Sequence, residues 1–339
     1  MALAAALVLS GAAGVAGLAG AQSESTDCSY PLTVTDATGT EVTVEAPPER
    51  VVTLAPSAAQ TMHEIGAWEN VVAISDRGTY LEGSEEKETI SGSEGFVSTE
   101  KVVAQEPDLV LAPDIIGDEK IAQLRESGLT VYNFESATSL DDVAAKTRLT
   151  GQLVGECEGA NERAAAFEQT VEAVETAVDG EESPTVLYLL GGEFTAGDGT
   201  FIDEIIETAG GTNVAAAANI SGYKQISREV VAAQDPEYIV TSSEAPEIVP
   251  TVPAYNGTTA VQNDQLLTVN ANYLNQPAPR TQQVLEDLSS TWHPDAYESA
   301  VESLGENTTA VTTATEAPGF GPIVALVAIL LVAGRFRTE

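Results

Sequence analysis

The segments TEKVVAQEPDLV at 99–110 and SREVVAAQDPEYIV at 227–240 decide the fold, because they repeat one pattern in the two halves of the chain. Each begins with a hydroxyl residue suited to cap a helix, continues through Glu and a short helical stretch, and passes a proline into an apolar strand. The spacing from the Glu to the Pro is the same in both. This internal duplication predicts two lobes that share one architecture.

Short apolar strands alternate with helical stretches on both sides of these segments. We expect strands at 51–54, 71–75, 108–111 and 131–134, and again at 186–190, 238–240 and 266–269, with a hairpin at 32–44. Such alternation is typical of α/β proteins. The sequence therefore predicts two Rossmann-like lobes with central, mostly parallel sheets.

A long helical pattern separates the two halves. Gly151, Gly155 and Gly159 interrupt it, so it forms two helices or one kinked helix, and we expect its second half to be a rigid connector. The predicted organisation is an N-terminal lobe at 22–138, a helical segment at 139–180 and a C-terminal lobe at 181–304. Ligands of open α/β sheets bind beyond the carboxyl ends of the strands, which predicts a ligand cleft between the lobes.

Charge excludes one class of partner. The 339 residues include 52 acidic and 14 basic side chains, for a formal net charge of -38. Nucleic acid is excluded as a partner, because few cations are present to neutralise its phosphates. We interpret the charge as a halophilic surface, whose self-repulsion is screened in molar salt and destabilises the fold in dilute buffer.

Cysteines and histidines give no sign of metal or catalytic chemistry. Cys28 and Cys157 either form a disulfide, as is common in exported proteins, or remain inert thiols. No two of these cysteines and the two histidines, His63 and His293, have the spacing of metal ligands. We expect His63 to be partly buried on a helix and His293 to lie at the surface. No nucleophile elbow, phosphate loop or complete dinucleotide fingerprint is present, so we predict that the protein is not an enzyme.

The N-terminus reads as an export signal. Residues 3–21 form an apolar stretch that ends in the small residues of a cleavage site, which predicts a signal peptide at 1–21. The alternative is a transmembrane helix.

The C-terminus reads as a surface anchor. Residues 305–317 form a Thr-rich stalk with a glycosylation sequon at Asn307, and residues 318–339 contain Pro-Gly-Phe, an apolar run and a basic end. This order resembles the PGF-CTERM sorting signal of archaeal surface proteins, and it implies a sortase-like processing enzyme as a partner. The alternative is an uncleaved tail anchor. Both place the protein on the outer face of the cell membrane.

Candidate ligand contacts follow the predicted strands. The loops there contain Pro56 and, as polar or aromatic residues, Ser57, Tyr80, Phe96, Phe194, Tyr223 and Asn272. Aromatic rings supply apolar contact area with little rotamer entropy to lose, which suits a cleft. For each ring the alternative is simple packing within a lobe.

Five segments carry a family resemblance. They are RVVTLAPSAAQTMHEIGA at 50–67, EKVVAQEPDLVLA at 100–112, FIDEIIETAGGTNV at 201–214, ISREVVAAQDPEYIV at 226–240 and PAPR at 277–280. Together they resemble the cobalamin/iron-siderophore class of ABC-transporter substrate-binding proteins, the class III periplasmic-binding-protein type. The likeness extends from Val51 to Leu288 and is nearest to the cobalamin-binding branch.

The resemblance implies a monomeric, bilobed protein that carries a small-molecule ligand, cobalamin or a related corrinoid, and has no cofactor. It implies ring contacts to the ligand at Tyr80, Phe194 and Tyr223, with Phe96 near another ring position and Pro113 where an aromatic residue is expected. Asn272 stands where an acidic contact is expected.

The resemblance also implies a docking partner, an ABC permease with its cytoplasmic ATPase. Glu100 and Glu229 match the pair of carboxylates, one per lobe, that contact arginines of that permease. The alternative role of each is an ordinary acid at a helix N-terminus, where it interacts favourably with the helix dipole.

Two other functions stay open. A ferric siderophore or haem carrier of the same fold favours basic residues around the ligand, and the candidates are only Lys224, Arg228 and Arg280. A structural or adhesion protein of the surface layer predicts tandem β-sandwich repeats, which the sequence does not show.

Overall fold

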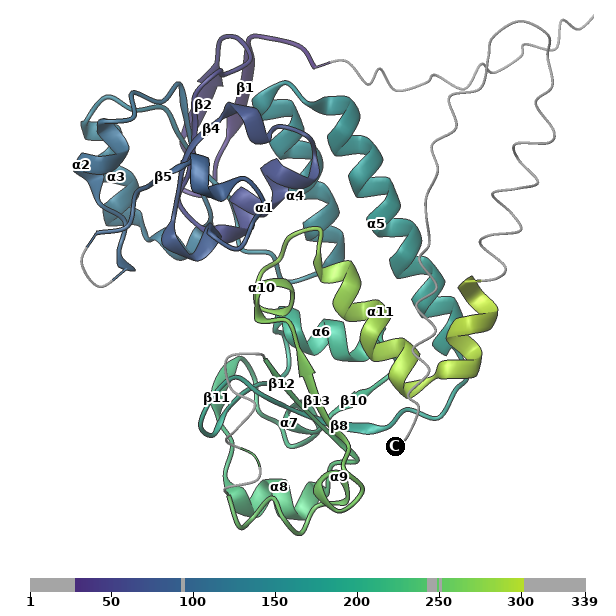
Figure 1. Ribbon diagram of the computed structural model, residues 1–339. Coiled ribbons are helices and arrows are strands. Elements are labelled where there is room, and N and C mark those ends of the chain that lie inside the picture. Colours follow the sequence, from purple (N-terminus) through teal and green to yellow (C-terminus); the bar gives the residue numbers. More distant parts are fainter. Residues whose placement is uncertain (1–27, 93–94, 243–248, 250–251, 302–339) are drawn as a thin grey trace, which may run out of the picture.

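Two parallel sheets organise the protein, one in each half of the chain, as the alternation of strands and helices predicted. The computed structural model describes residues 28–92, 95–242, 249 and 252–301. We call residues 28–138 the N-lobe and residues 181–301 the C-lobe; a pair of long helices runs along one side of both (Figure 1). The predicted signal peptide, stalk, sequon and sorting signal lie outside the described residues.

The N-lobe is built on a five-stranded sheet in which every neighbouring pair is parallel. Its spatial order is β5 (Glu88–Thr89), β4 (Val71–Ile74), β3 (Val51–Thr53), β6 (Leu109–Ala112) and β7 (Val131–Asn133). Val51 and Val52 of β3 are fully buried in different apolar clusters, because successive strand residues point to opposite faces. The sheet therefore needs cover on both faces.

Helices and a hairpin supply that cover. The α-helices of the N-lobe are α1 (Pro56–Glu64), α2 (Thr99–Val103) and α3 (Asp118–Glu126), and short 3₁₀ turns occupy Trp68–Asn70, Asp76–Gly78, Ser84–Glu86 and Asp114–Ile116. The predicted hairpin is present as antiparallel β1 (Leu32–Thr35) and β2 (Glu41–Val44).

The C-lobe repeats the plan with four parallel strands. Their order is β10 (Thr212–Asn213), β8 (Thr185–Leu189), β12 (Tyr238–Ser242) and β13 (Leu266–Val269). The helices are α6 (Phe201–Thr208), α7 (Val214–Ala217), α8 (Arg228–Gln234), α9 (Thr259–Gln262), α10 (Ala271–Leu274) and α11 (Thr281–Trp292). A separate antiparallel ribbon, β9 (Phe194–Ala196) with β11 (Tyr223–Gln225), follows the first C-lobe sheet strand, whereas the antiparallel pair of the N-lobe, β1 with β2, precedes its sheet.

The duplicated segments adopt matching structures. Ser98 and Ser227 cap α2 and α8, and the cap of α2 thus lies one residue before the repeated segment begins. Before the prolines, Glu106 and Asp235 both adopt left-handed backbone, with φ of 46° and 45°. Since non-glycine residues rarely adopt this conformation, its recurrence at equivalent positions supports the duplication.

Two helices, not one kinked helix, link the lobes. α4 (Leu140–Val154) ends at Gly155, whose φ of 88° suits a helix C-terminus, and α5 (Cys157–Val178) packs back along it. Gly151 and Gly159 do not interrupt the helices, contrary to expectation. A Cβ on Gly159 would lie 2.2 Å from the carbonyl oxygen of Ile65, so this glycine permits close packing instead.

The structure gives definite places to the two cysteines and to His293. Cys28 and Cys157 form a disulfide that joins the segment before β1 to the start of α5, with a Cα–Cα distance of 5.6 Å. The alternative of two inert thiols is therefore wrong. His293 is buried, not exposed, because α11 continues to Trp292 and brings the ring against Gly210, with Nε2 3.2 Å from the carbonyl oxygen.

Candidate functional site

A cleft of about 450 Å³ lies between the lobes. Its N-lobe wall consists of loops after β3, β6 and β7, and Lys146 of α4 adds to it. Its C-lobe wall consists of the start of α6, the start of β11 and the end of α10. The lining residues are Ala55, Pro56, Ser57, Pro113, Asp114, Ile115, Ser136, Ala137, Thr138, Lys146, Gly199, Thr200, Phe201, Gly222, Tyr223, Leu274, Asn275, Gln276 and Pro277. The carboxyl ends of the N-lobe strands thus face the cleft, as the α/β rule predicted.

Three of the predicted ligand contacts line this cleft. Pro56 and Ser57 form the first turn of α1, where β3 ends. Tyr223 opens β11 on the opposite wall, and its side chain is 51% exposed. Burial of the phenol raises the pKa of Tyr223, so its hydroxyl stays protonated and can donate a hydrogen bond.

Phe194 lies beside Tyr223, although it does not line the cleft. In the β9–β11 ribbon Tyr223 faces Ala196 and Gln225 faces Phe194. Because opposed residues of an antiparallel pair share a face, the two rings occupy diagonal positions on one face of the ribbon. Both are exposed, so the ribbon presents an aromatic surface continuous with the cleft wall.

Tyr80 and the backbone of Asn272 are both bound by Gln60, at the junction of the lobes. The amide Nε2 of the fully buried Gln60 donates to the Tyr80 hydroxyl at 2.7 Å and to the Asn272 carbonyl at 3.1 Å. The Oε1 of Gln60 accepts from the backbone N–H of Arg280 at 2.9 Å. Gln60 of α1 therefore bonds to two backbone atoms of the C-lobe. Phe96 lies elsewhere, 71% exposed on the loop before α2 and outside the cleft lining.

An ion cluster strengthens the same junction. Glu64 accepts hydrogen bonds from Arg163 Nε of α5 at 3.2 Å and from Arg280 Nε of the C-lobe at 2.8 Å. Burial alone would raise the pKa of Glu64, but hydrogen bonds and charge from Arg280 and Arg163 outweigh it and hold that pKa below the ordinary value. The cluster ties α1, α5 and the C-lobe together.

Sequence reasoning missed Gln60, Glu64 and Arg163 entirely. Arg280 belongs to the PAPR segment at 277–280, yet it was considered only as a possible ligand contact. Arg163 lies 99 residues from Glu64 along the chain, and Gln60 lies 212 and 220 residues from its two C-lobe partners, so no local pattern reveals these contacts.

Lys146 is a further residue that the sequence did not single out. It projects from α4 into the cleft, and its Nζ donates to the Glu135 carbonyl at 3.1 Å. Among the described lining residues it is the only cation, and Asp114 is the only anion. The basic residues that the sequence offered are outside this lining: Arg228, for example, pairs with Glu193.

The candidate docking acids lie far from the cleft. Glu100 and Glu229 are each the second residue of a helix, α2 and α8, and both are exposed. Hydrogen bonds from the local backbone and Ser227 lower the pKa of Glu229. The two helices occupy the outer parts of the two lobes, on the side away from α5 (Figure 1).

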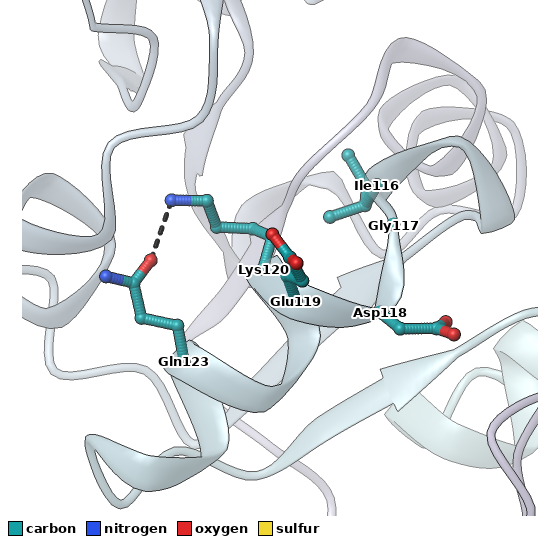
Figure 2. Close-up of a pocket in the computed structure, with 6 residues that line it drawn as sticks. All are labelled: Ile116, Gly117, Asp118, Glu119, Lys120 and Gln123. Carbon is teal, nitrogen blue, oxygen red and sulfur yellow. Dashed lines mark hydrogen bonds between the residues drawn. The ribbon is translucent and has the colours of Figure 1, made fainter.

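A second hollow lies on the N-lobe beside α3. Six residues line it, Ile116, Gly117, Asp118, Glu119, Lys120 and Gln123, and all come from one continuous stretch (Figure 2). Lys120 Nζ donates to Gln123 Oε1 at 2.8 Å and to Thr99 Oγ1 at 3.0 Å. The hollow is thus the surface of one helix start, and its amine is already used to hold α2.

The described residues contain no group of three or more His, Cys, Asp or Glu side chains that could hold a metal ion. Within the same part of the chain, none of the helices combines the length and the apolar character that crossing a membrane requires.

Comparisons with known proteins agree on one family. A family model described as periplasmic binding protein matches residues 51–273. A cobalamin-binding protein of Halobacterium salinarum is 41% identical over 277 residues, which cover 78% of this chain and 75% of the relative.

Solved structures show the same likeness. The periplasmic vitamin B12 binding protein BtuF of Vibrio cholerae superposes with a TM-score of 0.63 and 28% identity, covering 74% of this chain and 98% of that one. The periplasmic heme-binding protein RhuT from Roseiflexus, in apo form, superposes with a TM-score of 0.66 and 29% identity, covering 74% of this chain and 99% of that one.

Proposed function

This chain belongs to the periplasmic binding protein family, and from that premise we propose that it captures cobalamin or a related corrinoid outside the cell and delivers it to the permease of an ABC importer. The observation that carries the proposal is the cleft, which is lined by residues of both lobes and lies at the carboxyl ends of the N-lobe strands. A cleft of about 450 Å³ is within the size range of small-molecule sites. A corrinoid has a larger volume than this cleft, so it would contact both walls and remain partly exposed to solvent.

The ligand assignment is supported by similarity and by charge. The Halobacterium relative is named a cobalamin-binding protein. Haem is the second candidate ligand, because RhuT, which has the same fold, is named a heme-binding protein. Haem carries two carboxylates, whereas the only cation among the described lining residues, Lys146, is accompanied by Asp114. This balance favours a ligand whose periphery is mostly neutral.

Direct titration tests the ligand. The full-length protein, kept in molar salt, is titrated with cyanocobalamin, with haem and with a ferric hydroxamate, and binding is followed by tryptophan fluorescence and calorimetry. We expect tight, saturable binding of cyanocobalamin alone. Saturable binding of haem or of the hydroxamate, with none of cyanocobalamin, would reject the corrinoid assignment.

Docking through Glu100 and Glu229 is part of the same proposal. Two exposed carboxylates on a rigid body can define orientation as well as distance for a basic partner. We expect Glu229→Ala to leave cyanocobalamin affinity within about twofold and to slow uptake by the reconstituted importer several-fold, since the residue is outside the cleft. Loss of ligand binding in this variant would contradict the docking role.

The cellular placement follows from the sequence and the family. We propose an exported monomer whose partners are the permease, its cytoplasmic ATPase and a sortase-like enzyme acting on the C-terminal signal. The family consists of carriers rather than enzymes, which agrees with the absence of catalytic motifs from the sequence. Cleavage near residue 21 and glycosylation at Asn307 are checked by mass spectrometry of the mature protein.

A further inference from the structure

The position and contacts of Lys146 suit a cation that binds an anionic group of the ligand. Its side chain lines the cleft and also the small void below it, which Ser57, Phe134 and Pro277 help to enclose. The ammonium lies 5.6 Å from the centre of the Phe134 ring. An ammonium has three donors, and in the described part of the chain only the Glu135 carbonyl accepts from this one.

This ammonium is incompletely compensated. Burial lowers the pKa of Lys146, and the charges of Asp114 and Asp142 oppose that shift. Asp142 is committed elsewhere, because its carboxylate accepts the backbone N–H groups of Thr138 and Ser139 at the start of α4. Asp114 in turn accepts from the Ser136 hydroxyl. An anionic group of a bound ligand would supply the partner that these carboxylates do not provide.

Gln276 provides a second, independent observation on the opposite wall. Its side chain lines the cleft and is only 8% exposed. Within the described residues, its buried Oε1 has no hydrogen-bond partner. Buried polar atoms are nearly always paired, and this oxygen has almost no accessible surface, so the Gln276 side chain has to turn toward the cleft before the amide can pair with a ligand. A side-chain amide both donates and accepts, which matches a neutral carboxamide.

We propose that Lys146 binds the phosphodiester of a complete corrinoid while Gln276 pairs with one of its peripheral carboxamides, so that the cleft selects corrinoids that retain the nucleotide. The inference rests on the proposed function. Cobalamin carries a single phosphodiester charge and several neutral carboxamides, whereas cobinamide keeps the carboxamides and lacks the phosphodiester. A comparison of cobalamin with cobinamide therefore tests the Lys146 contact separately from the Gln276 contact.

The experiment compares cyanocobalamin and dicyanocobinamide on the full-length protein in a fixed high-salt buffer. Lys146→Gln should weaken cyanocobalamin binding about tenfold, as expected for the loss of a charge-assisted hydrogen bond, and leave cobinamide binding within about twofold. Lys146→Arg should restore most of the cyanocobalamin affinity. Gln276→Leu should weaken both ligands by a similar factor.

Lys120→Gln is the matched control, because Lys120 lies on α3 outside the cleft and should change neither affinity. Thermal melts of each variant separate loss of folding from loss of contact. Equal weakening of both ligands by Lys146→Gln, or no weakening of either, would overturn the role of Lys146. An unchanged Gln276→Leu variant would overturn that of Gln276. Failure of the wild type to bind either corrinoid would instead reject the proposed function.

Discussion

The two walls of the cleft differ much more than the two lobes that carry them. The lobes share parallel sheets, capped helices and matching left-handed residues before the prolines. Among the described lining residues, the N-lobe side and α4 supply both charges and no aromatic ring, whereas the C-lobe supplies Phe201, Tyr223 and two amides. The repeated part is thus the scaffold, and the unrepeated part is the surface that lines the cleft.

The disulfide gives the largest expected difference between the lobes. Cys28 and Cys157 are 129 residues apart, and their bond lies beside the N-lobe. Because long closed loops gain most from a crosslink, Cys28→Ser with Cys157→Ser should cost about 4 kcal/mol of unfolding free energy. Hydrogen exchange should show N-lobe strands losing protection first. Equal loss in both sheets would show that the lobes unfold as one unit.

Glu64 tests how firmly the lobes are joined. Glu64→Gln removes a charge that two arginines share, and we expect a loss of about 2 kcal/mol by chemical denaturation, at the modest end for a partly buried pair. The exposed Glu69→Gln should change stability by less than about 0.5 kcal/mol. A variant of Glu64 no weaker than this control would mean that the ion cluster contributes nothing to the junction.

Wild type and Glu64→Gln also give a prediction for the pH dependence of stability. The pKa of Glu64 is lowered in the fold, so its contribution is present above the unfolded-state pKa and is lost as pH falls through the folded-state pKa. The stability difference between wild type and Glu64→Gln should therefore stay constant at neutral pH and shrink below about pH 4. Denaturation at a series of pH values measures it, and a difference that grows on acidification would contradict the assignment.

Tyr223 tests the aromatic wall. Removing a half-exposed ring from the cleft should weaken cyanocobalamin binding about tenfold in Tyr223→Ala. Phe96→Ala is the control, because this ring is exposed on the N-lobe away from the cleft, and it should change affinity less than about twofold. Equal effects of the two variants would mean that both lobes contribute rings to the ligand.

Ile115 gives the smallest expected effect and tests the other wall. Its side chain is 81% exposed at the cleft, two residues after Pro113, which stands where a ring was expected. Ile115→Ser should weaken cyanocobalamin binding about threefold, since only part of the side chain would be buried by the ligand. A loss of affinity larger than that of Tyr223→Ala would mean that the N-lobe wall contributes more to binding than the C-lobe wall.

Much of the scaffold could be predicted from the sequence, because it depends on local patterns. The alternation and the duplicated segments predicted both central sheets, and of the three glycines expected to interrupt the helical segment, only Gly155 ends a helix. The cleft itself could be predicted only in part. Pro56 and Ser57 line the cleft because they follow β3, and Tyr223, which was expected in a loop and from the family resemblance, lines it at the start of β11.

The rest depends on tertiary contacts that leave no local signal. Lys146 looks like an ordinary solvated residue of a helix until α4 is placed against the cleft. Gly151 and Gly159 look like helix breakers, although close packing explains them. The contacts of Gln60 join positions 212 and 220 residues away, and no periodicity encodes such a pairing.

Gln60 has a consequence for how such carriers can diversify. Its amide holds the far lobe through a carbonyl oxygen at position 272 and an N–H at position 280, groups that nearly every amino acid provides. The side chain at position 272 can therefore change without altering this bond, whereas the side chain of Arg280 is also bound to Glu64. A family member could therefore change its ligand through substitutions in the cleft walls, while the buried Gln60 keeps the spacing between the lobes.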